Sequence, residues 1–309
     1  MSSTYFPEEF RAKYEKLLGN DAAEFFKFSQ KKIRKSLWIN SLKIPPKELL
    51  SKLEEKNWKL QPLQFHGNAF VIENIQKPGF SYEFKHGLLN LQEISSMLPA
   101  IVLQPLQNEL VLDCTAAPGN KTLQMSCLMQ GKGRIYAIES YQNRFKTLLY
   151  NVRKFWMKNV QAVKGDFLKL KTDKRFDKIL LDAPCSTEGI VRKEFFGLKG
   201  WSPKLVKRKA KIQKRMVEKA FQLLKPNGIL VYSTCSLSPE EDEEVVQNLL
   251  EENKNLSIEK IELPGIKLRK GLKSYEGKNF SPAIGNCARI LPQDNDTQAF
   301  FMAKIRRLE

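Results

Sequence analysis

Short apolar runs alternate with longer amphipathic stretches from about residue 110 onward. The apolar runs, each bounded by turn residues, predict strands at 110–113, 134–139, 160–164, 177–182 and 228–233. The amphipathic stretches predict helices at 120–130, 141–156, 202–225 and 239–253, and further strands are expected at 256–263 and 298–305. This alternation predicts an α/β fold, in which helices cover both faces of a parallel sheet.

The first part of the chain has a different pattern. It predicts a helix over 8–30, a strand at 37–40, a helix from Pro46 to about Lys56, and strands at 58–65 and 69–73. We therefore expect two domains, a small N-terminal α+β domain over residues 1–85 and a larger domain over residues 86–309. A helix at 91–103 is expected to pack across the larger sheet.

Positive charge is in large excess and is clustered. Lys and Arg number 52 against 34 Asp and Glu, a formal net charge of +18, which favours a polyanionic partner such as nucleic acid. One cluster lies at 31–35, and the predicted helix 203–224 carries eight basic residues but only Glu218 as an acid. Solvated basic surface is the alternative interpretation of both. The candidate RNA contacts are Lys31, Lys32, Arg34, Lys35, Lys207, Arg208 and Lys211.

Cysteine usage points to reduced thiols. The chain has five cysteines, an odd number, and no two of them form a C-x-x-C pair, so we expect neither a disulfide framework nor a metal site. The N-terminus lacks the pattern of a signal peptide, and no apolar run approaches the ~20 residues of a membrane span. We expect a soluble cytoplasmic protein that is monomeric and does not contact a membrane.

Two cysteines directly follow predicted strands. Cys185 comes after the run 178–184 and Cys235 after the run 229–234. Because the carboxyl ends of parallel strands meet at one edge of a sheet, both thiols are expected at the edge where ligands bind. Cys114, Cys127 and Cys287 are expected to be inert core residues.

Three further strand ends carry groups suited to a small cofactor. The turn Thr115–Lys121 lacks the glycines of a dinucleotide fingerprint, but its helix start suits a carboxylate. Glu139 ends the next strand, where an acid can accept hydrogen bonds from a ribose. Asp166 follows the third strand and suits an adenine amino group. Together these groups imply adenosine with a short amino-acid tail, that is, S-adenosyl-L-methionine.

These motifs resemble the Nop/Sun family of RNA cytosine-C5 methyltransferases. The resemblance rests on runs that occur in the family's order and cover most of residues 30–305, with compact archaeal tRNA enzymes nearest in appearance. The runs are 92–96, 113–122, 182–186, 233–243, 288–292 and 296–301.

The resemblance implies a Rossmann-like S-adenosylmethionine-dependent methyltransferase domain with a small N-terminal α+β RNA-binding domain. It implies that Cys235 is the nucleophile, that Cys185 assists release of the product, and that Asp182 contacts the cofactor or the target base. The implied cofactor contacts are Thr115, Ala116, Ala117, Pro118, Gly119, Asn120, Lys121, Glu139, Arg144, Asp166 and Asp182.

The chemistry explains why these residue types are needed. C5 of cytosine attacks a methyl group only after a thiolate has added at C6, and a proton or hydrogen bond at N3 stabilises that adduct. Asp182 ends its strand and suits the N3 role. Arg192 and Lys193, just beyond Cys185, suit either thiolate stabilisation or an RNA phosphate.

Some positions depart from the family pattern, and some alternatives stay open. Thr187-Glu188 stand where Gly and a small residue are usual, so the effect of the Glu188 charge on the Cys185 thiol is open. Asn120, Asp242 and Gln298-Ala299 also depart, without removing a reacting group. We expect 5-methylcytosine formation in tRNA. The alternatives are rRNA methylation, a non-catalytic RNA-binding assembly factor, and a DNA methyltransferase that uses Cys185 instead.

Overall fold

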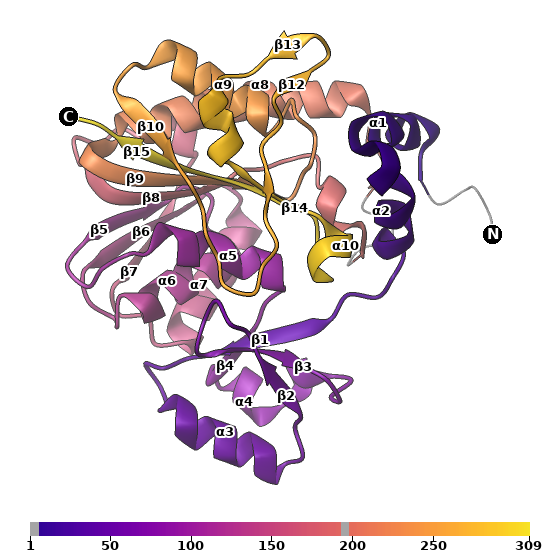
Figure 1. The fold of residues 1–309 in the computed structure, drawn as a ribbon. Helices are drawn as coiled ribbons and strands as arrows, with labels where there is room; N and C mark the ends of the chain where they lie inside the picture. Colours follow the sequence, from indigo (N-terminus) through magenta and orange to yellow (C-terminus); the bar gives the residue numbers. More distant parts are fainter. Residues whose placement is uncertain (1–5, 193–197) are drawn as a thin grey trace.

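The computed structural model describes residues 6–192 and 198–309, and it is built around one large sheet (Figure 1). Five strands are parallel, in the order β9-β8-β5-β6-β7, and β15 pairs antiparallel with β9. β14, β11 and β10 complete this sheet beyond β15. The bounds are β5 (Leu110–Asp113), β6 (Arg134–Glu139), β7 (Val160–Lys164), β8 (Phe176–Asp182), β9 (Leu224–Thr234), β10 (Leu256–Glu259), β11 (Arg269–Lys270), β14 (Ala288–Ile290) and β15 (Phe300–Arg307).

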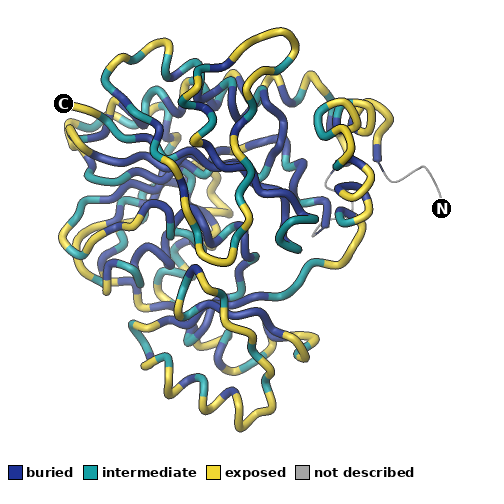
Figure 2. The backbone as a smooth tube through the Cα atoms, in the orientation of Figure 1, coloured by how far each residue is buried: buried dark blue, intermediate teal, exposed yellow. Residues whose placement is uncertain are grey.

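Helices cover both faces of this sheet, because its strands alternate apolar side chains between the faces. Leu180 of β8 and Val231 of β9 join one core, with helices α5 (Ile94–Leu103) and α6 (Asn120–Leu128). Their neighbours Leu181 and Tyr232 join the opposite core, with α8 (Pro203–Gln222) and α9 (Glu243–Glu252). Helix α7 (Gln142–Lys154) packs on β6 and β7. The strands are buried throughout the middle of the molecule (Figure 2).

A second sheet lies below the first one in Figure 1 and has the order β2-β3-β1-β4. Leu37 and Ile39 of β1 face helix α3, whereas Trp38 between them joins the core on the α5 side of the large sheet. The small sheet is therefore held between α3 and the large domain. The bounds are β1 (Lys35–Ile39), α3 (Pro46–Glu55), β2 (Leu60–Pro62), β3 (Ala69–Ile72), α4 (Tyr82–Lys85) and β4 (Leu89–Leu91).

The N-terminal helices do not join the small sheet. The expected helix over 8–30 is divided into α1 (Glu8–Leu18) and α2 (Ala22–Ser29) by a 3-10 turn at Gly19–Asp21. Phe10 and Tyr14 of α1 pack with Trp201 and Leu237 of the large domain. The small sheet also continues to Leu91, past the expected boundary at residue 85. The division into residues 1–85 and 86–309 stays a proposal.

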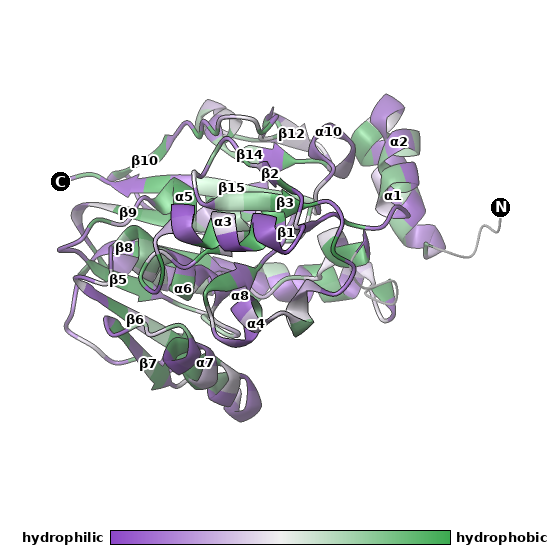
Figure 3. Ribbon diagram, turned by 90° about the horizontal axis from the view of Figure 1, so that it is seen from below, coloured by the Kyte–Doolittle hydropathy of each residue, from purple (hydrophilic) through white to green (hydrophobic). Residues whose placement is uncertain are grey.

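The α/β architecture predicted from the sequence is confirmed. Strands β5, β6 and β7 have the predicted bounds, β8 begins one residue earlier than predicted, and β9 begins four residues earlier. The strands are mainly hydrophobic, while the outer helices carry hydrophilic residues (Figure 3). The patterns missed β4 and β14, because three residues are too few to establish a period of two.

Two short elements complete the fold. Strands β12 (Ser274–Tyr275) and β13 (Lys278–Asn279) form a hairpin, and helix α10 (Pro292–Asn295) lies beside α2. In the part of the chain that the structure describes, no helix is long and apolar enough to cross a membrane. Residues 6–192 and 198–309 contain no group of three or more His, Cys, Asp or Glu side chains that could hold a metal ion.

Truncation of Phe10 tests the docking of the N-terminal helices. Phe10 is fully buried and its ring lies 5.1 Å from that of Trp201. We expect Phe10→Ala to lower the free energy of unfolding by about 3–5 kcal/mol, because it leaves a cavity in this cluster. Urea denaturation measures the change. The exposed Glu9→Ala in the same helix is the control and should stay within about 0.5 kcal/mol of wild type.

Candidate active site

The two cysteines that follow β8 and β9 lie next to each other. The Sγ atoms of Cys185 and Cys235 are 3.1 Å apart, as expected for the ends of neighbouring parallel strands. Hydrogen bonding to Cys235 and burial raise the pKa of Cys185 well above its usual value. Cys185 therefore keeps its proton and can donate it in a hydrogen bond to the sulfur of Cys235.

The loop after β8 inserts a carboxylate into the loop after β9. Glu188 is buried and accepts hydrogen bonds from the hydroxyls of Ser236 and Ser238, at 2.7 and 2.6 Å. It also accepts from the Trp201 indole at 2.7 Å and from the Tyr14 hydroxyl of α1. Burial disfavours its charge, but nearby Lys13 and these donors outweigh that effect and lower the pKa of Glu188.

In the opposite direction, a carboxylate from the loop after β9 binds the loop after β8. Glu241 accepts hydrogen bonds from the Ser186 amide at 2.9 Å, from the Ser186 hydroxyl, and from the Gln213 side chain at 3.0 Å. Burial and the negative charge of Glu188 raise the pKa of Glu241 to about 7. We call this exchange of Glu188 and Glu241 the reciprocal brace. Among the described residues, Glu188 points into this brace and has no hydrogen bond to a thiol.

Gly189 brings the two loops into backbone contact. Its amide donates to the carbonyl oxygen of Cys235 at 2.7 Å. A Cβ atom at this position would lie 2.3 Å from the Ala299 carbonyl oxygen and 2.8 Å from that of Cys235. Only glycine fits so close a backbone approach.

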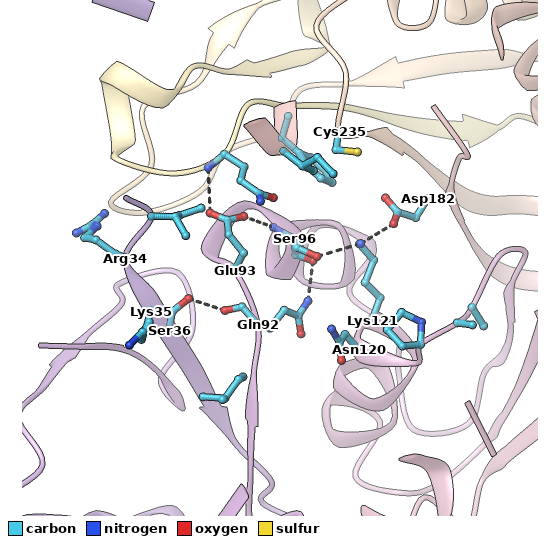
Figure 4. Close-up of a pocket in the computed structure, with 18 of the residues that line it drawn as sticks. Arg34, Lys35, Ser36, Gln92, Glu93, Ser96, Asn120, Lys121, Asp182 and Cys235 are labelled. Atoms are coloured by element: carbon cyan, nitrogen blue, oxygen red, sulfur yellow. Dashed lines mark hydrogen bonds and ion pairs between the residues drawn. The ribbon is translucent and has the colours of Figure 1, made fainter. Parts of the chain in front are cut away.

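Asp182 lies at the end of β8 within a polar network. Its carboxylate accepts from Lys121 Nζ at 2.6 Å and from the Ser233 hydroxyl at 2.8 Å. Lys121 also contacts the Ser96 hydroxyl at 3.1 Å (Figure 4). In this structure the predicted cofactor contact Lys121 is thus the ion-pair partner of Asp182.

Cys235 and Asp182 open into a cavity of about 530 Å³ between the two sheets (Figure 4). Of the two cysteines, Cys235 lines the cavity. Cys185 is not among the described residues that line it. Asp113 also lines the cavity, and burial raises the pKa of its carboxyl group to about 6. The small sheet supplies the opposite wall, through residues 33–36 and 78–79.

Asp182 and most of the turn 115–121 line the cavity, whereas the predicted cofactor residues Gly119, Glu139, Arg144 and Asp166 are not among its lining residues. Thr115, Ala116, Ala117, Pro118, Asn120 and Lys121 line the cavity. Gly119 precedes α6 with a φ of 112°, and α6 begins without a side-chain cap. Arg144 donates to the Ala117 carbonyl oxygen at 2.6 Å, and its Nε atom lies 3.6 Å from the Oε2 atom of Glu139. Asp166 caps a short 3-10 helix by accepting from the Leu168 amide.

The predicted RNA contacts have different environments. Lys31, Lys32, Lys207, Arg208 and Lys211 are exposed, while Arg34 and Lys35 line the cavity. The guanidinium of Arg192 is buried and binds the Asp296 carboxylate and backbone carbonyls, so we drop Arg192 as an RNA contact and assign it a structural role. Lys193 lies outside the described residues.

The sequence analysis missed part of this wall. Glu93 caps α5, accepts from the Gln298 amide at 3.0 Å and lines the cavity. Phe300 lines it as well. Glu93 and Phe300 lie in the motif runs 92–96 and 296–301, so the sequence did mark their segments. Neither residue follows a predicted parallel strand, and the sequence analysis therefore did not assign them to a site.

Comparisons with known proteins identify relatives over nearly the whole chain. Residues 100–306 match the family described as 16S rRNA methyltransferase RsmB/F, and residues 6–94 match the N-terminal domain of 16S rRNA methyltransferase RsmF. A tRNA (cytosine(49)-C(5))-methyltransferase of Pyrococcus abyssi is 39% identical over 96% of this chain and 94% of its own length. Ribosomal RNA small subunit methyltransferase F of Vibrio atlanticus is 35% identical over 99% of this chain, which spans only 65% of that relative.

Solved structures show the same fold. A methyltransferase homologue from Pyrococcus horikoshii is 32% identical, covers all of both chains and has a TM-score of 0.86. NSun6 from Pyrococcus horikoshii, solved with SFG, is 23% identical with a TM-score of 0.84 and supports the fold alone.

Removal of Glu188 should destabilise the brace. Glu188→Ala leaves the buried donors of Tyr14, Trp201, Ser236 and Ser238 without their acceptor. Because each such donor costs about 1–3 kcal/mol, we expect the free energy of unfolding to fall by at least ~3 kcal/mol. Urea denaturation measures this, with the exposed Glu252→Ala as the control. A loss no larger than the control's would contradict the role of the brace.

Glu241 should make stability depend on pH. Its pKa of about 7 in the folded protein exceeds the ordinary 4.5, so the folded state binds its proton more tightly than the unfolded state. Stability from this group is therefore present below about pH 4.5 and is lost as the pH rises toward 7. Relative to wild type, Glu241→Gln should gain up to ~3 kcal/mol across this window.

Denaturant unfolding at pH 4.5, 5.5, 6.5 and 7.5 measures this difference. The exposed Glu252→Gln is the matched control and should differ from wild type by a constant amount. If the difference in unfolding free energy between Glu241→Gln and wild type is also constant with pH, the raised pKa of Glu241 is contradicted.

Proposed function

This chain belongs to the RsmB/F family, the Nop/Sun family of RNA cytosine-C5 methyltransferases, and on this basis we propose that it forms 5-methylcytosine in tRNA. The observation that carries the proposal is the pair of sulfur atoms 3.1 Å apart, one of which lines a cavity shared with Asp182. A non-catalytic assembly factor has no need of such a pair.

The turn 115–121 and Glu139 fit S-adenosylmethionine, which is the family's methyl donor. The start of α6 has no side-chain cap, so its amides are free to bind the carboxylate of the amino-acid tail. The buried carboxylate of Glu139 can accept hydrogen bonds from a ribose, while Arg144 steadies the turn at Ala117. We keep Asp166 as an adenine contact. When bound, this cofactor supplies an electrophilic methyl group.

The residues of this chain prepare the cytosine for methylation. We propose that Cys235, as a thiolate, adds to C6 of the target base and makes C5 nucleophilic. As the sulfur adds to C6, N3 takes up a proton from water, and the Asp182 carboxylate accepts a hydrogen bond from the resulting N3–H. Lys121 and Ser233 hold this carboxylate in place. After methylation the C5 proton passes to a base or water, and the Cys235–C6 bond breaks.

Cys185 assists the last step. Its pKa is raised, so it keeps a proton that it can donate to the departing sulfur of Cys235 at 3.1 Å. A hydrogen bond to the leaving thiolate stabilises it and speeds release of the product. This division of roles favours Cys235 over Cys185 as the nucleophile, against the DNA-methyltransferase alternative.

The choice of tRNA rests on the relative from Pyrococcus abyssi, which aligns with this chain over 94% of its own length. rRNA is the second candidate, because the family and the Vibrio relatives bear that name. The exposed basic residues Lys31, Lys32, Lys207, Arg208 and Lys211 are proposed to bind phosphates. We further propose a cytoplasmic monomer.

Labelled-methyl transfer to RNA tests the two cysteine roles. Wild-type protein should methylate unmodified tRNA transcripts, and Cys235→Ala should lose transfer by at least about 100-fold. Cys185→Ala should instead accumulate a covalent protein–RNA complex, seen as a band that resists denaturing electrophoresis. Bisulfite sequencing of the RNA identifies the modified cytosine.

The buried Cys287→Ala is the matched control, since it removes a thiol that lies outside the cavity lining of the described residues. Full transfer by Cys235→Ala would refute the nucleophile. Transfer to rRNA but not to tRNA would replace the proposed substrate and keep the chemistry.

A further inference from the structure

An exposed aromatic residue, Phe80, directly follows two residues that line the active-site cavity. Pro78 and Gly79 line the cavity, and the 3-10 turn Pro78–Phe80 ends on the next residue of the chain. Phe80 is 72% exposed, the largest value among the exposed large hydrophobic residues of the described chain. It belongs to none of the hydrophobic clusters of the described residues, whereas Phe84 of the following helix packs against the core of the small sheet. Packing therefore does not account for Phe80.

The surroundings of Phe80 are positively charged. Lys85 Nζ lies 5.9 Å from its ring centroid, and the exposed Lys77 precedes the turn. Lys35 lines the cavity and donates to the carbonyl oxygens of Ile75 and Gln76, in the segment that leads to Phe80. The nearby acid Glu83 is buried and paired with Lys56, so it does not offset this charge.

A second flat ring lies two residues further on. Tyr82 is 61% exposed, and its ring stacks on that of His86 with centroids 3.8 Å apart and an interplanar angle of 24°. Lys56 Nζ lies 6.0 Å from the Tyr82 centroid. Aromatic rings interleaved with lysines are the combination that binds unpaired nucleotides, since rings stack on bases and lysines bind phosphates.

We propose that Phe80 is a stacking platform for an unpaired base of the RNA substrate that adjoins the target cytosine. The inference rests on the proposed function, because a base that reaches Cys235 must leave its stack. Its neighbour in the RNA then has an exposed face, and the Phe80 ring covers it at the mouth of the cavity. Lys77 and Lys85 bind the phosphates on either side. Phe80 is a binding residue for RNA and does not touch the reacting atoms.

Steady-state kinetics with unmodified tRNA transcripts test this proposal. We expect Phe80→Ala to lower kcat/KM for RNA by about 5- to 150-fold, the range corresponding to loss of one base stack, mostly through KM. Phe80→Leu should lose as much, because it keeps apolar bulk without an aromatic face. Phe80→Trp should restore the wild-type value to within about threefold. KM for S-adenosylmethionine should not change in any of them.

Leu106→Ala is the matched control. Leu106 is 63% exposed in the loop before β5, at the end of the strand opposite the cavity, so its truncation should leave both KM values unchanged. Wild-type RNA kinetics in Phe80→Ala or in Phe80→Leu would overturn the proposal, as would a change in oligomeric state on gel filtration, which would assign Phe80 to a protein contact. If wild-type protein methylates no RNA, the proposed function fails instead.

Discussion

The reciprocal brace between the loops after β8 and β9 is the interaction on which the active site depends. Parallel pairing of the two strands brings their ends together, but loops beyond the last paired residue are free to separate. Glu188 and Glu241 cross in opposite directions between these loops and satisfy buried donors there. Two buried carboxylates are tolerated because each accepts several hydrogen bonds, and separation of the loops would break the bonds to Ser186, Ser236 and Ser238.

The brace also explains the position of the N-terminal helices. Tyr14 reaches Glu188 from α1, and Lys13 forms an ion pair with Glu240 at 2.9 Å. Helices α1 and α2 thus support the cysteine loops from outside, while the small sheet that follows them in sequence forms the opposite wall of the cavity. Residues 6–91 therefore contribute to the site twice, from two directions.

The cavity is lined by residues from both parts of the molecule. Asp182 and Cys235 are positioned by the large sheet, whereas Lys35 lies at the start of β1 in the small sheet. Arg34 and the turn Pro78–Phe80 lie in the segments that flank the strands of the small sheet. The two sheets that line the cavity are held together by the core that contains Trp38 and Val71.

The sequence by itself determined the elements of the large sheet and the strand-end positions of Asp182, Cys185 and Cys235, because these depend on local periodicity and on the geometry of parallel strands. Only the tertiary structure decided which cysteine lines the cavity, that Arg192 is buried, and that α1 docks on the large domain. These outcomes depend on contacts between residues far apart in the chain, such as Tyr14 with Glu188. No local pattern encodes such contacts, since the same charged or aromatic residue suits a solvated surface, a buried brace or an RNA contact until its neighbours in space are known.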